Sequence, residues 1–148
     1  MGDLDFLNFE TQTETGFGNM TDTKAIVKVL FVDDEKSILV ALRRLCRNTG
    51  WDIYTAESGD EGLAIIDEHT IDLVVSDMRM PNMNGAQFLE QVVERSPSTV
   101  RILLTGYSEV AATVAAIDRG KIFCHCTKPW DNDEFREILN KAIASRKE

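Results

Sequence analysis

The sequence predicts an α/β fold: a doubly wound, five-stranded parallel sheet in the flavodoxin-like order 2-1-3-4-5, with helices on both faces. From Ile26 onward, short apolar runs alternate with stretches of helical periodicity. The runs are largely unbroken by polar residues, which is typical of parallel strands buried on both faces. Right-handed crossovers between strands of this kind favour the order given above.

The first strand is predicted over Ile26–Val32, and an amphipathic helix follows it. The apolar stripe of this helix consists of Ile38, Leu39, Leu42, Leu45 and Cys46. Residues with this spacing lie on one face of a helix, so the stripe is expected to pack on the sheet. The turn from Asn48 to Gly50 closes the helix, and Trp51–Ala56 is the second predicted strand.

Ser58 is the predicted N-cap of the second helix, in which Gly62 costs up to about 1 kcal/mol relative to alanine. The third strand is predicted over Ile71–Ser76. A loop containing Pro81 follows, and Asn84 is the predicted N-cap of the third helix.

The fourth and fifth strands are predicted over Val100–Thr105 and Ile122–Cys126. The last helix repeats the apolar stripe of the first, with Phe135, Ile138, Leu139, Ala142 and Ile143. It is therefore also expected to pack on the sheet.

Composition limits the number of domains and the kind of partner. The 148 residues are 43% hydrophobic, enough for one domain, which we expect over residues 25–148. Residues 1–24 are acidic, rich in Thr, Gly and Asn and without periodicity, so we expect a disordered arm. The net charge of -9 argues against direct binding of nucleic acid. The sequence contains no signal peptide or membrane span, which favours a cytoplasmic location.

Polar residues follow the ends of four predicted strands. Asp33 and Asp34 follow the first strand, Asp77 the third, Thr105 ends the fourth, and Lys128 follows the fifth. In a doubly wound sheet, ligands bind at the carboxyl ends of the strands where the strand order reverses, here between the first and third strands. Converging carboxylates repel one another unless a cation compensates, and Mg²⁺ is commonly held by one or two carboxylates and a phosphate.

These residue types match the needs of phosphoryl transfer. A carboxylate can attack phosphorus to give an aspartyl phosphate, and Asp77 is placed for that role. The charge on the equatorial phosphoryl oxygens would be stabilised by the metal, the Thr105 hydroxyl and the Lys128 ammonium. We therefore interpret the chain as a phosphorylatable switch.

The same residues carry a family resemblance. VDDE, Asp77 in SDMRMPNMNG, Thr105 in LLTGY and Lys128 in TKPW resemble the receiver domain of two-component response regulators over about residues 25–146. The resemblance implies that Asp77 is the phosphoacceptor and Asp34 a direct metal ligand. It also implies that Asp33 is a second acid acting partly through water. Mg²⁺ is the expected metal, with Mn²⁺ as a substitute.

The resemblance assigns further roles. The backbone carbonyl of Arg79 would be another metal ligand, and Pro129 would follow Lys128 through a cis peptide. The segment LLTGYSEVAATVAAI with KPWD is similar to receivers that precede HD-GYP phosphodiesterase domains. The expected partners are a sensor histidine kinase or a histidine phosphotransfer protein, and an output domain or effector protein. A stand-alone shuttle is the alternative to a regulator with an output domain.

The resemblance also implies how the switch works. Thr105 is drawn toward the phosphoryl group, and an aromatic residue three places before the lysine rotates, which alters the face formed by helix four, strand five and helix five. That face is also the expected surface of a homodimer. Here the aromatic position is His125, a departure from the family pattern. Arg79 and Tyr107 are expected to obstruct hydrolytic water and to lengthen the lifetime of the phosphoryl group.

Two other functions fit parts of the pattern. A small Mg²⁺-dependent aspartyl-nucleophile phosphatase would use the same residue types, but that family carries a DxD motif after its first strand and a substrate-binding cap. A flavin-binding module would share the fold, but the expected phosphate loop does not follow the first strand. Cys124, His125 and Cys126 do not predict a zinc site, because strand alternation places the histidine on the opposite face from the cysteines.

Overall fold

The computed structural model describes residues 26–106 and 121–146. The elements are β1 (Lys28–Val32), α1 (Lys36–Leu45), β2 (Asp52–Ala56), α2 (Gly59–Glu68), β3 (Leu73–Asp77), α3 (Gly85–Arg95), β4 (Val100–Thr105), β5 (Cys124–Thr127) and α5 (Asn132–Ala144). The expected N-terminal arm and fourth helix, and Tyr107, lie outside the described residues.

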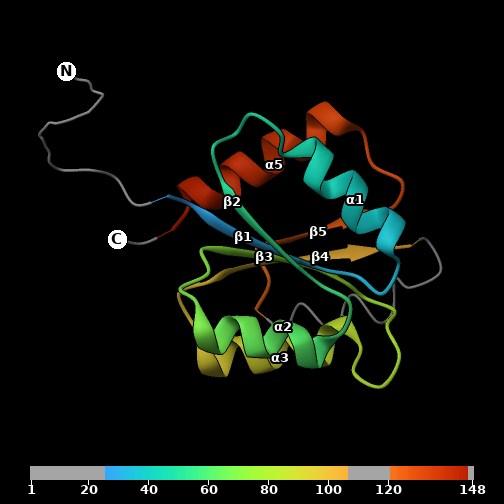
Figure 1. The fold of residues 1–148 in the computed structure, drawn as a ribbon, viewed down its shortest axis with the longest axis vertical. Helices are drawn as coiled ribbons and strands as arrows, with labels where there is room; N and C mark the ends of the chain where they lie inside the picture. The colour runs from blue at the N-terminus through green and yellow to red at the C-terminus, as the bar shows by residue number, and fades with distance from the viewer. Residues whose placement is uncertain (1–25, 107–120, 147–148) are drawn as a thin grey trace, which may run out of the picture.

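The strands form one parallel sheet in the order β2-β1-β3-β4-β5. Helices α1 and α5 cover one face of this sheet, and α2 and α3 cover the other (Figure 1). The predicted fold class and strand order are therefore confirmed. Within residues 26–106 and 121–146, every helix is too short or too polar to cross a membrane.

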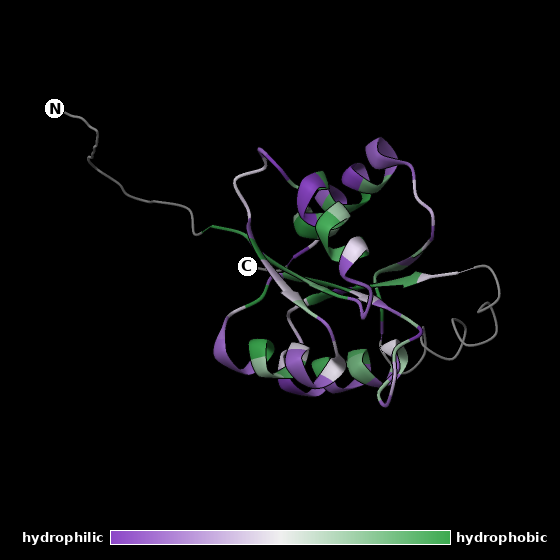
Figure 2. Ribbon diagram, turned by 45° about the vertical axis from the view of Figure 1, so that its right-hand side comes forward, coloured by the Kyte–Doolittle hydropathy of each residue, from purple (hydrophilic) through white to green (hydrophobic). Residues whose placement is uncertain are grey.

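Two apolar layers hold the helices to the sheet, because successive strand residues point to opposite faces. On β1, Val29 and Phe31 pack in the layer that contains α1 and α5 residues, whereas Leu30 and Val32 pack in the layer with α2 and α3. Figure 2 shows the strands as the hydrophobic centre and the helices with mixed polarity on either side. Each fully buried valine, leucine or phenylalanine side chain contributes roughly 1.5–3 kcal/mol to the free energy of folding.

β4 has the predicted bounds, Val100–Thr105, and the other strands begin or end within two residues of their predicted bounds. β1 begins at Lys28 rather than Ile26, whose side chain is 61% exposed. β3 extends to Asp77, which pairs with Leu104 of β4, so the acid is the last residue of a strand rather than part of the following loop. β5 runs over Cys124–Thr127, because pairing with β4 begins only where Cys124 meets Ile102.

The predicted caps are confirmed. The Ser58 hydroxyl accepts a hydrogen bond from the Glu61 amide, and Asn84 forms a reciprocal capping box with Gln87. After α1, Asn48 and Gly50 adopt positive φ angles of 71° and 80°, which the reversal into β2 requires. These caps and positive-φ residues determine where the chain turns between the helices and the strands.

Gly62 is needed for packing, although glycine has a low helix propensity. It is buried where α2 meets the sheet and α3, and an added Cβ would lie 2.8 Å from Phe88 and 3.2 Å from Val32. An added Cβ at Gly59, the other buried glycine of α2, would instead meet the flexible side chain of Met83.

We expect Gly62→Ala to lower the free energy of unfolding by about 1–3 kcal/mol, because overpacking against a ring outweighs the gain in helix propensity. Gly59→Ala is the matched control and should change stability by less than about 1 kcal/mol. Urea unfolding of both variants measures this difference. A Gly62→Ala protein as stable as Gly59→Ala would show that α2 and α3 are not tightly packed there.

Candidate functional site

The carboxyl edge of the sheet gathers the predicted site residues. Asp33 and Asp34 follow β1, Asp77 ends β3, Thr105 ends β4, and Lys128 follows β5. Because all five strands are parallel, their carboxyl ends lie on one edge, and β1 and β3 are neighbours in the sheet. The topology therefore brings residues 44 or more positions apart, such as Asp33 and Asp77, to one place.

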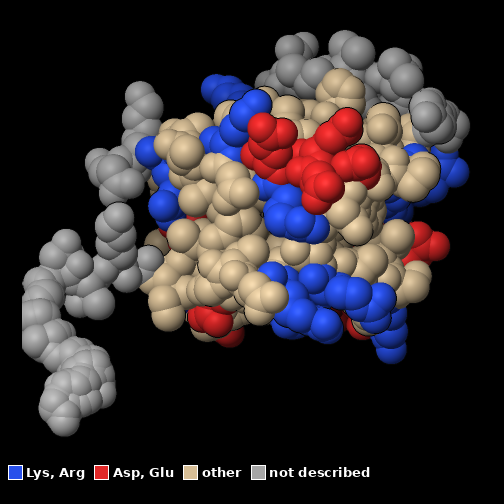
Figure 3. Space-filling model, turned by 90° about the horizontal axis from the view of Figure 1, so that it is seen from above, with Lys and Arg blue, Asp and Glu red and all other residues tan. Residues whose placement is uncertain are grey.

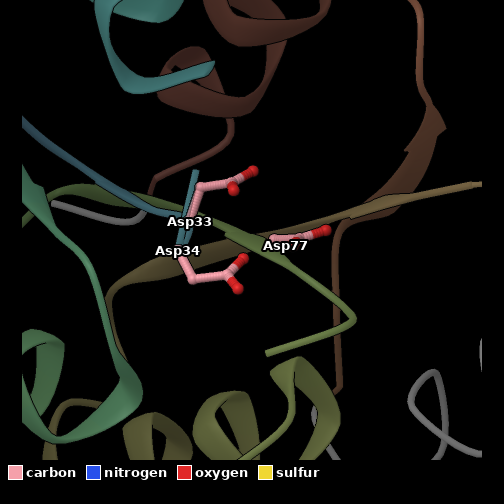
Figure 4. Close-up of side chains that lie close together, drawn as sticks. All are labelled: Asp33, Asp34 and Asp77. Atoms are coloured by element: carbon pink, nitrogen blue, oxygen red, sulfur yellow. The ribbon is translucent and has the colours of Figure 1, made fainter. Parts of the chain in front are cut away.

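The three aspartates face one another. Carboxylate oxygens of Asp33, Asp34 and Asp77 all lie within 4.8 Å of each other. Figure 4 shows the three side chains projecting in the same direction beyond the ends of β1 and β3. Asp33 and Asp77 are 1% and 6% exposed, whereas Asp34 is exposed. Two of the three charges are thus held away from solvent, where mutual repulsion is strongest.

Lys128 supplies the opposing charge. Its Nζ donates a hydrogen bond to Asp33 Oδ2 at 2.9 Å and lies 3.0 Å from Asp77 Oδ1. Burial by itself would lower the pKa of Lys128, but the hydrogen bonds to Asp33 and Asp77 outweigh it and raise the pKa above its ordinary value. The lysine therefore remains an ammonium ion between the two acids.

Ionisation of Asp77 is unfavourable even with Lys128 present. Burial raises the pKa of Asp77 to about 6, the hydrogen bond from Lys128 opposes this shift, and the charges of Asp33 and Asp34 add to it. Its ionised form therefore has a free-energy cost that another cation could remove. Raised carboxyl pKa values of this kind are common at functional sites.

The backbone around the acids is firmly placed. The Asp33 amide donates to the Ala56 carbonyl at 3.1 Å, and Asp33 Oδ1 accepts from the Glu35 amide at 2.9 Å. The Gly85 amide donates to the Met78 carbonyl at 2.8 Å, and a Cβ at Gly85 would clash with the Asp77 carbonyl oxygen. Glycine is therefore needed where α3 begins against the end of β3.

A cavity of about 580 Å³ opens beside these acids. Its lining comprises Asp34, Glu35, Asp77, Arg79, Met80, Pro81, Gly106 and Lys128. The ligand atoms of this site suit a divalent cation. Carboxylate oxygens are hard ligands, and three of them within 4.8 Å of one another match the needs of Mg²⁺, which keeps several of its waters. The residues present therefore fit the expected metal, and Arg79 lines the same cavity.

The structure also describes three other predicted residues, Thr105, His125 and Pro129. Thr105 is 3% exposed, and its hydroxyl donates to the Cys126 carbonyl at 3.4 Å. The Lys128–Pro129 peptide bond is cis. His125 is exposed on β5 and borders a second cavity of about 260 Å³, apart from the acids. Tyr107 lies outside the described residues.

Sequence reasoning missed Glu35 as a site residue. Its carboxylate lies 4.0 Å from Lys128 Nζ, and it lines the cavity with Asp34 and Asp77. The sequence feature that could have revealed it is the third acid of VDDE. Glu35 is the N-cap residue of α1, but its side chain makes no capping hydrogen bond. An acid at a cap position that makes no cap is free to face the site instead.

The helices α1 and α5 present mixed charge on their outer surface. Figure 3, seen from their side of the molecule, shows a cluster of acidic side chains and a separate band of basic ones. The exposed acids of α5 include Asp133 and Glu134, and α1 carries Arg43 and Arg44 in its last turn. This face is therefore not a broad basic surface.

Comparisons with known proteins agree with the geometry. The family model for the response regulator receiver domain matches residues 29–140. The chain is 35% identical over 115 residues to the transcriptional regulatory protein GlrR of Escherichia coli K12, covering 78% of this chain and 26% of GlrR. It is 37% identical over 120 residues to the DNA-binding transcriptional regulator NtrC of Salmonella typhimurium LT2, covering 81% and 25%.

A solved structure shows the same fold. The signal receiver domain of an HD domain-containing protein from Pseudomonas fluorescens Pf-5 has a TM-score of 0.78 and 31% identity, covering 81% of this chain and 96% of that one. The chain spans about a quarter of the length of the curated relatives named above. These matches favour a receiver over an aspartyl-nucleophile phosphatase. The chain belongs to the family of response regulator receiver domains.

Proposed function

We propose that this receiver domain takes a phosphoryl group onto Asp77 and so acts as the switch of a two-component phosphorelay. The observation that carries the proposal is the position of Asp77: its carboxylate ends β3, lines an open cavity and lies 3.0 Å from the Lys128 ammonium, with two further acids beside it. A nucleophile, a cation and a metal-binding acid pair are the groups that phosphoryl transfer needs.

The transfer begins from a phosphohistidine of a sensor histidine kinase or of a histidine phosphotransfer protein. An Asp77 carboxylate oxygen attacks phosphorus as the P–N bond breaks, and the histidine leaves with the bonding electron pair. Mg²⁺, or Mn²⁺ in its place, would be held by Asp33, Asp34, Asp77 and the Arg79 carbonyl, and would neutralise charge on the phosphoryl oxygens. Lys128 exchanges its contact with the Asp77 carboxylate for one with the transferred group.

The phosphoryl group then changes the end of β4. It adds nearly two negative charges and three acceptor oxygens, toward which the Thr105 hydroxyl can turn. In doing so the hydroxyl leaves the Cys126 carbonyl, its partner in this structure. The displacement would reach His125 and the face to which β5 and α5 contribute. That face is our proposed contact surface for an output domain, an effector protein or a second copy of the chain.

The biological setting follows from this chemistry. We assign the receiver to residues 25–148 and an arm to residues 1–24. The domain regulates rather than turning over a substrate, and it works in the cytoplasm, where kinase and phosphodonor are found. Curated relatives such as NtrC are named as DNA-binding regulators. Any effect of this receiver on DNA would be indirect, because the chain has a net charge of -9 and the face in Figure 3 carries mixed charge.

Incubation of the full chain with a small phosphodonor such as acetyl phosphate tests the proposal. With Mg²⁺ we expect about one acid-stable, base-labile phosphoryl group per molecule, and with EDTA almost none. Continuous release of inorganic phosphate well above the loss of the label would instead indicate a phosphatase. Absence of any label with the metal supplied would refute the proposal.

Replacement of Lys128 should affect both stability and chemistry. Lys128→Ala leaves Asp33 buried without its cation, so we expect the metal-free protein to lose about 2–4 kcal/mol of stability. Phosphorylation from the small donor should slow about a hundredfold, because one transition-state donor is lost. Lys141→Ala, on the exposed surface of α5, is the matched control and should leave both quantities nearly unchanged.

Arg79 should set the lifetime of the phosphoryl group. It is exposed and lines the cavity two residues after Asp77, where it would obstruct an attacking water. We expect a long-lived phosphoryl group in the native chain, and a half-life about three- to tenfold shorter in Arg79→Ala. Loss of label after removal of the donor measures this. A native half-life of seconds, or no change in the variant, would contradict the role of Arg79.

A further inference from the structure

Two cysteines lie side by side on the edge strand next to the site. Cys124 and Cys126 are two residues apart on β5, so they share one face of the strand, and both pack in the apolar layer beneath α5. Their side chains are close enough for each thiol to influence the pKa of the other. Among the described residues, the only other cysteine is Cys46, which is buried at the end of α1.

Both thiols can be reached by a small oxidant. Cys124 is half-buried, and Cys126, 9% exposed, lines the second cavity of about 260 Å³ together with Pro129 and Trp130. The interaction with the Cys126 thiol lowers the pKa of Cys124, whereas burial raises the pKa of Cys46 to about 11. Since the thiolate is the reactive form, Cys124 is favoured as the first thiol to react.

We propose that Cys124 and Cys126 form a dithiol that a hydroperoxide converts into a disulfide within β5, and that this modification slows phosphoryl acceptance at Asp77. The Cys124 thiolate attacks the terminal peroxide oxygen, the O–O bond breaks, and a sulfenic acid forms as water or alcohol leaves. The Cys126 sulfur then attacks the Cys124 sulfur, the S–O bond breaks, and water leaves with the Cys126 proton. The two thiols lose two electrons, and the peroxide gains them.

The disulfide would distort the strand. Residues two apart on an extended strand are separated by about 6.6 Å between Cα atoms and by a similar distance between Cβ atoms, whereas a disulfide requires Cβ atoms about 3.5–4.5 Å apart. β5 must therefore contract as the bond forms. The contraction is local, because β5 is a four-residue strand and, among the described strands, pairs with β4 alone. A disulfide of this kind is readily reduced by cellular thiols, so the modification is reversible.

The distortion would act directly on the phosphorylation site. The Cys126 carbonyl accepts the Thr105 hydroxyl, and the Lys128 amide donates to the Thr105 carbonyl at 2.7 Å. Lys128 in turn holds Asp33 and Asp77 at 2.9 and 3.0 Å. A shift of β5 therefore displaces both groups that would contact the phosphoryl oxygens. This part of the inference rests on the proposed function.

Mass spectrometry of the full chain tests the modification without any phosphorylation. After treatment with hydrogen peroxide we expect a loss of two hydrogens, a disulfide mapped to Cys124 and Cys126, and full reversal by dithiothreitol. Cys46→Ala should behave as the native chain, whereas Cys124→Ser and Cys126→Ser should not lose the two hydrogens. Oxygen added to Cys124 or Cys126 in place of the disulfide, a disulfide through Cys46, a link between two chains or no reaction at these thiols would each overturn the proposal.

Phosphodonor labelling then tests the consequence. The rate of labelling should fall about tenfold in the oxidised protein and return on reduction, since displacement of contacting groups by a fraction of an ångström is costly. Peroxide-treated Cys124→Ser should keep its untreated rate. An unchanged rate in the fully oxidised native chain would overturn the link to Asp77. If the reduced chain takes no label at all, the proposed function fails, and the dithiol is then judged on mass alone.

Discussion

Asp77→Asn should abolish covalent phosphorylation of the chain, with labelling by a small phosphodonor reduced at least about a hundredfold. The substitution preserves the shape of the side chain and its place at the end of β3, but an amide is a very poor nucleophile for phosphorus. The quantity measured is phosphoryl incorporation per molecule in the presence of Mg²⁺.

Asp52→Asn is the matched control. Asp52 is an exposed acid at the amino end of β2, whereas the site lies at the carboxyl ends of the strands. It should be labelled as the native chain is. If Asp77→Asn retained native labelling, Asp77 would not be the acceptor, and the neighbouring acids Asp33 and Asp34 would have to be considered.

The same substitution should stabilise the metal-free fold above pH 7. The pKa of Asp77 is about 6 in the folded protein and 3.8 in the ordinary state, so between these values the folded state binds a proton that the unfolded state has released. Stability of the native chain therefore falls as the pH rises from about 4 to 6, by roughly 3 kcal/mol. Asparagine does not ionise and avoids this loss.

Urea unfolding in EDTA at several pH values measures the effect. We expect Asp77→Asn to be more stable than the native chain by about 2–3 kcal/mol at pH 8, with the difference shrinking to near zero by about pH 4. Mg²⁺ should narrow the gap at pH 8, because a bound cation stabilises the native chain more than the variant. A pH-independent difference between the two proteins would show that ionisation of Asp77 is not its cause.

Much of the fold is predictable because apolar runs and turn residues are local signals. Ser58 and Asn84 reveal the starts of α2 and α3 through their capping chemistry. Ile26 is misleading, since its apolar side chain extends the run that forms β1 but is exposed in the structure. Pattern alone does not tell whether a partner strand reaches the end of an apolar run.

The positions of the site residues follow from the strand ends, but their pairing does not. The sequence places Asp33, Asp77 and Lys128 at one edge of the sheet. Whether Lys128 contacts one acid or both depends on how β5 pairs with β4, a long-range property. The same holds for Gly62, whose fit against Phe88 depends on how α2 and α3 meet. Helix propensity alone indicates only that Gly62 destabilises α2.

Locating the phosphoryl group on the chain tests the central claim most directly. After reaction with a small phosphodonor and Mg²⁺, reduction with borohydride converts an aspartyl phosphate to homoserine, which peptide mass spectrometry can place. We predict homoserine at Asp77 and at no other aspartate. Homoserine elsewhere, or an unchanged Asp77 in labelled protein, would contradict the account.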